Sequence, residues 1–245
     1  VPSSLDDAEP FVLSKREIRG KLSNGMLASP SELGLFDNHD GILEINESEV
    51  GAELMKPGIE FKKLYGLDDV LFDFENKMFT HRPDCFGQIG VARELAAIQG
   101  TKYTSPDWYL NLPTFDNNFD TAPSVGLGAG EKVPRLVAVA MDSVVVGESP
   151  VWLKSFITRM GGKPVNNVVD ITNYIMHVTG QPTHAYDLAK LFALGKRDNP
   201  GVIDIAARMA RAEESINLLN GKTIKLDAED IVISSGGVAV GVAGI

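Results

Sequence analysis

The segment that decides the fold is residues 165–188, which read VNNVVDITNYIMHVTGQPTHAYDL. Apolar residues recur in it at the spacing of three and four that predicts a helix, and Gly180 is a typical helix terminator. The stripe that we expect to be buried consists of Val168, Ile171, Ile175 and Val178. The opposite face carries Asn166, Asp170, Asn173, Tyr174 and His177. Because mostly uncharged hydrogen-bonding groups replace the Lys and Glu of a solvated face, this helix predicts a pocket.

Composition limits the classes of function. The 245 residues, 44% of them apolar, suffice for one or two domains with a core. No stretch approaches the roughly 20 apolar residues of a membrane helix, so no membrane association is expected. The net charge of -10, from 23 basic and 33 acidic residues, opposes indiscriminate binding to phosphates, so contact with nucleic acid must be local. The single cysteine, Cys85, fits a reducing, cytoplasmic compartment. The ends of the chain, Val1 and Ile245, suggest an internal fragment.

The N-terminal part reads as short strands and turns over residues 11–46, which favours a small β-barrel, followed by a half-buried strand at 69–75. A helix is expected from a cap at Asp84 to Gly100. Residues 101–133 lack a sustained period and collect Pro and Gly, which is typical of a connector. We read the glycine run 126–130 as part of this linker.

A second domain begins with an apolar segment, 136–146, expected to be a central strand covered on both faces. Ser149 and Pro150 predict the start of a helix that ends at Gly161 and Gly162. Later strands are expected at 202–208, 231–233 and 238–240, with a hairpin at 216–226 that turns at Asn220-Gly221. Strands and helices mix without strict alternation, so the predicted fold is α+β with a mixed sheet.

Three runs, in the same order, resemble the beta subunit of bacterial-type phenylalanyl-tRNA synthetase. They are IRGKLSNGML at 18–27, RPDC at 82–85 with IGVAREL at 89–95, and the segment 164–188. The resemblance implies four parts: the C-terminal part of an OB-type tRNA-binding barrel (1–66), a small helical domain (67–102), a linker (103–133) and a C-terminally truncated editing domain (134–245). The chain departs from the family in an incomplete barrel, in Thr80-His81, and in stopping before the segment with the editing-pocket glutamate.

The resemblance also implies the chemistry. The family joins phenylalanine to tRNA-Phe in a heterotetramer of alpha and beta subunits, using ATP and magnesium, and its editing domain hydrolyses tyrosine mistakenly esterified to that tRNA. This chain would contribute tRNA binding and editing, with no cofactor of its own. A site that hydrogen-bonds the tyrosine hydroxyl can reject phenylalanine by as much as ~10⁴ to 10⁵, because its buried polar groups are otherwise left unpaired.

Site residues follow from the same resemblance. His184 corresponds to a histidine near the tyrosine hydroxyl, and Thr172 and Asn173 to residues beside the substrate amino group. Gly241 and Gly244 correspond to glycines that leave room for the aminoacyl ester. Two further candidates for substrate binding are Asn166 and Asn167. The candidates for tRNA binding are Arg19, Lys21, Ser23 and Met26, next to Lys15 and Arg16 in the one basic cluster near the start of the chain.

Other interpretations stay open. Thr172 can bond a carbonyl one turn back instead, Asp170 and His177 can satisfy loop backbone, and the basic cluster can be a solvated face. No spacing of residues supports a metal site, and no motif supports a covalent nucleophile, so a positioned water is the expected attacking group. Two alternative functions are a non-catalytic tRNA-binding module and a free-standing hydrolase that edits in trans.

Overall fold

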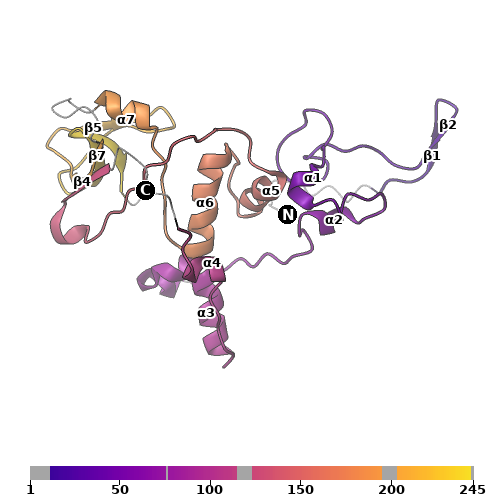
Figure 1. Ribbon diagram of the computed structural model, residues 1–245, viewed down its shortest axis with the longest axis horizontal. Coiled ribbons are helices and arrows are strands. Elements are labelled where there is room, and N and C mark those ends of the chain that lie inside the picture. Colours follow the sequence, from indigo (N-terminus) through magenta and orange to yellow (C-terminus); the bar gives the residue numbers. More distant parts are fainter. Residues whose placement is uncertain (1–11, 76, 115–122, 195–202, 244–245) are drawn as a thin grey trace. The chain divides into compact units, whose positions relative to one another are not determined.

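The computed structural model describes residues 12–75, 77–114, 123–194 and 203–243 (Figure 1). The chain forms two compact units, each built from two stretches of sequence. Unit 1 comprises Val1–Asp107 and Val145–Ala185, and unit 2 comprises Trp108–Val144 and Tyr186–Ile245. Helices are combined with a mixed parallel and antiparallel sheet, so the α+β class is confirmed. The four-part division predicted from the sequence stays a prediction.

Unit 1 is mainly helical in the part that the structure describes. Its strands are β1 (Arg16–Ile18) and β2 (Lys21–Ser23), and its α-helices are α1 (Glu47–Val50), α2 (Phe61–Leu64), α3 (Gln88–Ile98), α5 (Val151–Arg159) and α6 (Asn167–Thr179). Two 3-10 helices, η1 (Lys77–His81) and η2 (Pro83–Phe86), precede α3, and α4 (Asp107–Leu110) lies where the two units meet in the sequence.

The start of α5 packs into a core made by residues 35–67. This core consists of Leu35, Phe36, Val50, Tyr65 and Val151. The backbone N–H of Val151 donates to Glu49 Oε2 at 2.9 Å. Above the ring of Phe36 lies the Lys154 ammonium group, 4.6 Å from the ring centroid. The apolar residues of this region are therefore used to hold α1 and α2 against α5.

The predictions of two strands in this region are wrong. Residues 41–45 and 69–75 adopt no strand, and the strands described between residues 12 and 66 are only β1 and β2. In the first segment Leu43 and Ile45 pack against the helical core instead. In the second, Phe72 and Phe74 stack on one another and are exposed. Alternating apolar residues suit a strand, but a strand also needs a backbone partner.

Helix α3 begins later than predicted. Gly87, and not Asp84, is its N-cap residue, and Asp84 lies in η2. The Asp84 carboxylate accepts two hydrogen bonds from Arg82 and one from Arg93, each at 2.9 Å. These guanidinium groups, Arg82 foremost, hold the pKa of Asp84 well below its usual range. The carboxylate is committed to this ion pair network and does not cap the helix.

Backbone meets backbone where the end of α6 contacts the segment before α3. A Cβ atom on Gly87 would fall on the Gly180 nitrogen and the Thr179 carbonyl carbon, and one on Gly180 would lie 2.8 Å from the Pro83 oxygen. A Cβ atom on Gly90 would likewise fall on the Asp84 carbonyl. Only glycine permits approaches this close, so these positions determine how α3, η2 and α6 pack (Figure 1).

The predicted ends of α5 and α6 are confirmed, and α5 starts within one residue of its predicted start, with Pro150 and not Ser149 as its N-cap residue. Asn166 is the N-cap of α6, where its Oδ1 accepts from the Val169 N–H at 3.0 Å. Gly180 ends this helix in the left-handed conformation, with φ 75°. Helix α5 begins one residue after Pro150 and stops just before Gly161, whose φ is 81°. These signals are local, so the sequence reveals them.

Unit 2 is built on a four-stranded sheet with the strand order β3-β4-β7-β8. Its strands are β3 (Pro123–Gly128), β4 (Ile203–Met209), β7 (Ile231–Ser235) and β8 (Val238–Val242). Strands β3 and β4 are parallel, and the other pairs are antiparallel. A separate hairpin joins β5 (Ser215–Asn217) to β6 (Thr223–Lys225), with η3 (Gly130–Lys132) and α7 (Leu188–Leu194) as the helices. The buried core beneath the hairpin consists of Ala210, Ile216, Leu226 and Val232.

Two expectations for unit 2 are corrected. The glycine run is not a simple linker, because Gly126 and Gly128 lie in β3. Cβ atoms there would lie 3.0 Å and 3.2 Å from the Cβ atoms of Ala206 and Arg208, so small residues let β3 pair closely with β4. Residues 136–146 form no strand, and Val139 and Val145 are 76% and 81% exposed. The later strands and the Asn220-Gly221 turn, with φ 80° at Gly221, are confirmed.

An ion pair joins β4 to the turn that follows it. Arg208 Nη1 and Nη2 donate to the two carboxylate oxygens of Glu214 at 2.8 Å and 2.6 Å. Arg208 Nη2 also donates to the Gly237 carbonyl, and Glu214 accepts from the Arg211 N–H. The Arg208 guanidinium is the main cause that lowers the pKa of Glu214 from 4.5 to about 2. Both side chains are about 15% exposed, so water screens this pair only weakly.

We expect acid to weaken unit 2 through Glu214. A carboxyl group whose pKa is lowered by folding stabilises the native state above its unfolded pKa, and this contribution disappears as the pH falls through the folded value. The loss should therefore occur between pH 4.5 and about 2. Urea unfolding across this range should show a shallower pH dependence for Glu214→Gln than for the wild type. Glu229→Gln, an exposed glutamate of the same unit, should keep the wild-type slope.

Candidate functional site

The polar face of α6 is mostly an internal contact with α5. The Tyr174 ring packs edge-on against Trp152 and Phe156, with centroid distances of 5.5 Å and 4.9 Å. His177 lies one turn further along α6, and the centroid of its ring is 6.3 Å from that of the Phe156 ring. Burial lowers the pKa of His177. Tyr174 and His177 are therefore packing residues, and the structural interpretation of His177 is favoured.

Asp170 is fully buried, although the helix pattern suggested an open polar face. Its Oδ2 accepts from the buried Ser149 hydroxyl at 2.5 Å, and its Oδ1 accepts from the Val165 N–H at 2.9 Å. Ile171, expected in the buried stripe, is 53% exposed instead. The carboxylate holds together the segment before α5 and the segment before α6, which matches the expected role in satisfying loop backbone.

Asn166 and Asn167 also use their amides within the fold. Asn166 caps α6, as described above. Asn167 Oδ1 accepts from the Gly147 N–H at 3.1 Å, and its Nδ2 donates to the Val145 carbonyl at 3.0 Å. The Asn167 N–H donates to the Gly147 carbonyl as well. The Asn167 bonds attach residues 145–147 to the start of α6 and use both ends of its side-chain amide.

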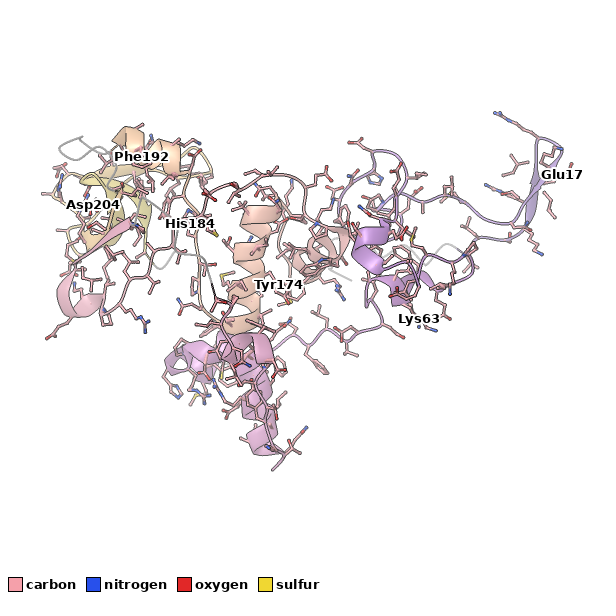
Figure 2. All side chains as sticks on the ribbon, viewed as in Figure 1. Glu17, Lys63, Tyr174, His184, Phe192 and Asp204 are labelled. Carbon is pink, nitrogen blue, oxygen red and sulfur yellow. The ribbon has the colours of Figure 1, made fainter. Side chains whose placement is uncertain are left out.

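His184 lies on a segment that returns along α6 after the turn at Gly180. Its neighbour Thr183 donates a hydroxyl hydrogen bond to the Thr172 carbonyl at 3.3 Å, which fixes the direction of the returning chain. Figure 2 shows the exposed His184 side chain beside α6. The structure thus brings His184 to the same level of the helix as Thr172 and Asn173, which are distant from it in sequence.

Thr172 and Asn173 differ in which of their hydrogen-bonding groups remain available to a ligand. The Thr172 hydroxyl donates to the Val169 carbonyl at 2.6 Å, so the alternative bond within the helix does form. Its oxygen still carries lone pairs that can accept a hydrogen bond. Asn173 is partly exposed, and its amide makes no hydrogen bond with the described residues. Both groups can therefore accept from a ligand's amino group.

Gly241 lies in β8 of unit 2, paired with Ile233. A Cβ atom built there would lie 2.8 Å from the phenolic oxygen of Tyr186, so this side chain takes the space that the missing Cβ leaves. Sequence reasoning missed Tyr186, because no local signal connects it to Gly241. Gly244 lies outside the described residues.

The candidates for tRNA binding lie on or near the exposed β1–β2 ribbon (Figure 1). Arg19 and Gly20 form its turn, with φ values of 51° and 75°. Lys21 follows the turn, and its side chain is exposed, as is that of Met26. Ser23 donates its hydroxyl to the Gly25 carbonyl at 2.9 Å. The ribbon presents Arg19 and Lys21 to solvent next to each other.

In the part of the chain that the structure describes, no helix is long and apolar enough to span a membrane. Nor do three or more His, Cys, Asp or Glu side chains gather there as metal ligands would.

The chain is similar to known proteins over nearly its whole length. Residues 132–245 match the B3/4 domain family. The beta subunit of phenylalanine–tRNA ligase from Vibrio parahaemolyticus is 34% identical over 236 residues, which is 96% of this chain and 27% of that protein. The corresponding subunit from Carboxydothermus hydrogenoformans is 36% identical over 239 residues, with the same coverage. Over 96% of its length the chain is similar to one segment of phenylalanine–tRNA ligase beta subunits. It spans about a quarter of the length of these relatives.

The resemblance noted from the three sequence runs is thus confirmed. Those runs lie in unit 1 except for residues 186–188, and the geometry now gives several of their residues a physical reason. Gly90 and Gly180 permit close backbone contacts, Arg82 and Asp84 form an ion pair, and Asn167 binds the chain before α5.

Replacement of Asp170 by alanine should destabilise the protein by about 3 kcal/mol, because the Ser149 hydroxyl and the Val165 amide lose their buried acceptor. Ser149→Ala removes one of the two bonds and should cost about 1 kcal/mol. Urea denaturation measures both changes. Equal stability of the Asp170→Ala variant and the wild type would contradict the structural role of this carboxylate.

Proposed function

We propose that this chain provides part of the tRNA binding and the hydrolytic editing of tyrosyl-tRNA-Phe by a phenylalanine–tRNA ligase. The observation that carries the proposal is the match to beta subunits over 96% of the chain, together with the B3/4 match over residues 132–245. The ligase would work in the cytoplasm with an alpha subunit, and ATP and magnesium would serve its aminoacylation reaction. No editing step uses either of them.

The editing reaction is an ester hydrolysis. A water oxygen bonds to the carbonyl carbon of the tyrosyl ester, the bond from that carbon to the ribose oxygen breaks, and the ribose oxygen takes up a proton. We propose that orientation of the ester beside a bound water contributes most of the rate, since well-oriented reactants avoid a large entropic cost. No side chain of this chain needs to form a covalent bond.

In this proposal His184 recognises the phenolic hydroxyl of the bound tyrosine. Its imidazole can donate to or accept from a hydroxyl, and the returning segment holds it beside α6. The Thr172 oxygen and the Asn173 amide accept hydrogen bonds from the substrate ammonium group. A phenylalanyl ester would leave the imidazole without this partner, which favours its rejection.

Replacing His184 tests this role in the intact ligase. His184→Ala should lower the preference for deacylating tyrosyl-tRNA-Phe over phenylalanyl-tRNA-Phe by about tenfold or more, the value of one lost hydrogen bond. His184→Gln keeps a side-chain N–H donor and should retain more of the preference. His81→Ala, which alters another exposed histidine, should retain all of it. An unchanged preference in His184→Ala would refute the assignment, whereas a wild-type ligase without any deacylation would favour the non-catalytic binding module.

We propose further that Arg19 and Lys21 contact the tRNA phosphates, because both are exposed on a ribbon within an otherwise acidic chain. Each neutralised phosphate releases counterions, which makes affinity depend on salt. Arg19→Gln with Lys21→Gln should weaken tRNA-Phe binding and reduce the slope of log K against log salt by about 1.5. The charge-matched control, Lys56→Gln with Lys102→Gln, should leave the slope unchanged. A reduction of equal size in both double variants would show that only the overall charge matters.

A further inference from the structure

Helix α5 carries an aromatic and a cationic side chain on one face. Trp152 and Arg159 are seven residues apart, which is about two turns of a helix, so they lie on the same side of α5. Phe156 lies between them on this side. The Trp152 side chain is 40% exposed, and Arg159 is partly exposed, whereas Leu153 and Ile157 are buried. This face of α5 is therefore open to solvent.

Helix α6 supports the Trp152 ring from one side. The rings of Trp152 and Tyr174 meet at 84°, with their centroids 5.5 Å apart, and Phe156 packs against the same Tyr174 ring. A single neighbouring ring covers at most one face of the indole, so ring surface of Trp152 is available for stacking. Because the ring is already held by a neighbour, a stacking partner orders little additional side-chain freedom.

The charge of this part of unit 1 is opposite to that of the whole chain, which is -10. Residues 149–186 include three cations, Lys154, Arg159 and Lys163. Asp170 is the single acidic residue of this stretch, and it is fully buried. The surface that these residues form is therefore positive within an acidic protein, which favours a negatively charged partner.

Two of the three cations have no acidic partner among the described residues. Lys154 Nζ forms an ion pair with Glu148 at 3.1 Å. Arg159 uses only its Nε, which donates to the Ser155 carbonyl at 3.4 Å, and so keeps both Nη groups. Lys163, just after the helix, is exposed. Arg159 and Lys163 can therefore bind an anion such as a phosphate.

We propose that this face of α5 binds the single-stranded 3′ end of tRNA, with one base stacked on Trp152 and phosphates on Arg159 and Lys163. Aromatic rings next to cations hold single-stranded nucleic acid in this way. A duplex keeps its bases stacked on one another, so the ring selects a single strand. The inference rests on the proposed function, because α6 carries both Tyr174 and the candidate site residue Asn173, and both helices belong to unit 1.

Binding of a short single-stranded RNA to the intact ligase tests the stacking contact. With a fluorescently labelled RNA that has the 3′-terminal sequence of tRNA-Phe, Trp152→Ala should raise Kd by about tenfold, the effect of one lost base–aromatic stack. Trp152→Phe keeps a ring and should raise Kd less. Trp108→Ala removes the other tryptophan, which is 48% exposed, and should leave Kd unchanged. An unchanged Kd in Trp152→Ala, or an equal loss in Trp108→Ala, would overturn the inference.

Charge variants keep the aromatic packing and test the phosphate contacts separately. Arg159→Gln with Lys163→Gln should reduce the slope of log K against log salt for the labelled RNA by about 1.4, the value for two phosphates of a single strand. The charge-matched control, Lys56→Gln with Lys102→Gln, should keep the wild-type slope. An unaltered slope in the Arg159 and Lys163 double variant would contradict the phosphate contacts.

Whole tRNA shows which single strand occupies this face. Unlabelled tRNA-Phe should displace the labelled RNA, whereas tRNA-Phe without its unpaired 3′ nucleotides should displace it poorly. Equal displacement by both would overturn the assignment to the 3′ end. Trp152→Ala should also lower kcat/KM for deacylation of tyrosyl-tRNA-Phe. If the wild-type ligase binds the labelled RNA through Trp152 but deacylates no tyrosyl-tRNA-Phe, the proposed function fails and the RNA-binding face is supported.

Discussion

The contact between Gly87 and Gly180 is the constraint on which the rest of unit 1 depends. It brings the backbone at the end of α6 against the segment that leads into α3, at a separation that no Cβ atom permits. Gly180 also adopts the left-handed conformation that ends α6, so a single residue satisfies two demands. The chain leaves this point in a defined direction and returns along the helix to Thr183 and His184. The position of His184 is thus a consequence of glycine packing.

Polar groups on α6 serve two purposes that the sequence does not distinguish. Asp170, Asn166 and Asn167 accept hydrogen bonds from the backbone N–H groups of Val165, Val169 and Gly147. Thr172 and Asn173 keep capacity for a ligand. A polar helix face therefore indicates side chains that form hydrogen bonds, and only the surrounding structure tells whether their partners belong to the protein or to a substrate.

The sequence correctly predicted the features that depend on neighbouring residues in the chain. The stops at Gly161 and Gly180 and the turn at Asn220-Gly221 all depend on a few adjacent residues. The failures depend on distant partners. Segments 69–75 and 136–146 carry strand-like alternation, but no described residues pair with them. The first three residues of the glycine run 126–130, in contrast, lie in a strand because β4 pairs with them. For the candidate site, the family resemblance identified His184 as a candidate, whereas the contact of Tyr186 with Gly241 could be found only in the structure.

The parallel pairing of β3 with β4 affects how the protein folds during its synthesis. Helices α5, α6 and α7 lie between these strands in the chain, so a ribosome synthesises β3 well before its partner. The helices of unit 1 can form from nearby residues as they emerge, because local contacts need little loop closure. The sheet cannot form until β4 has been synthesised. Co-translational folding should therefore complete unit 1 first, and the nascent chain is most open to chaperones and to aggregation in the interval before β4 arrives.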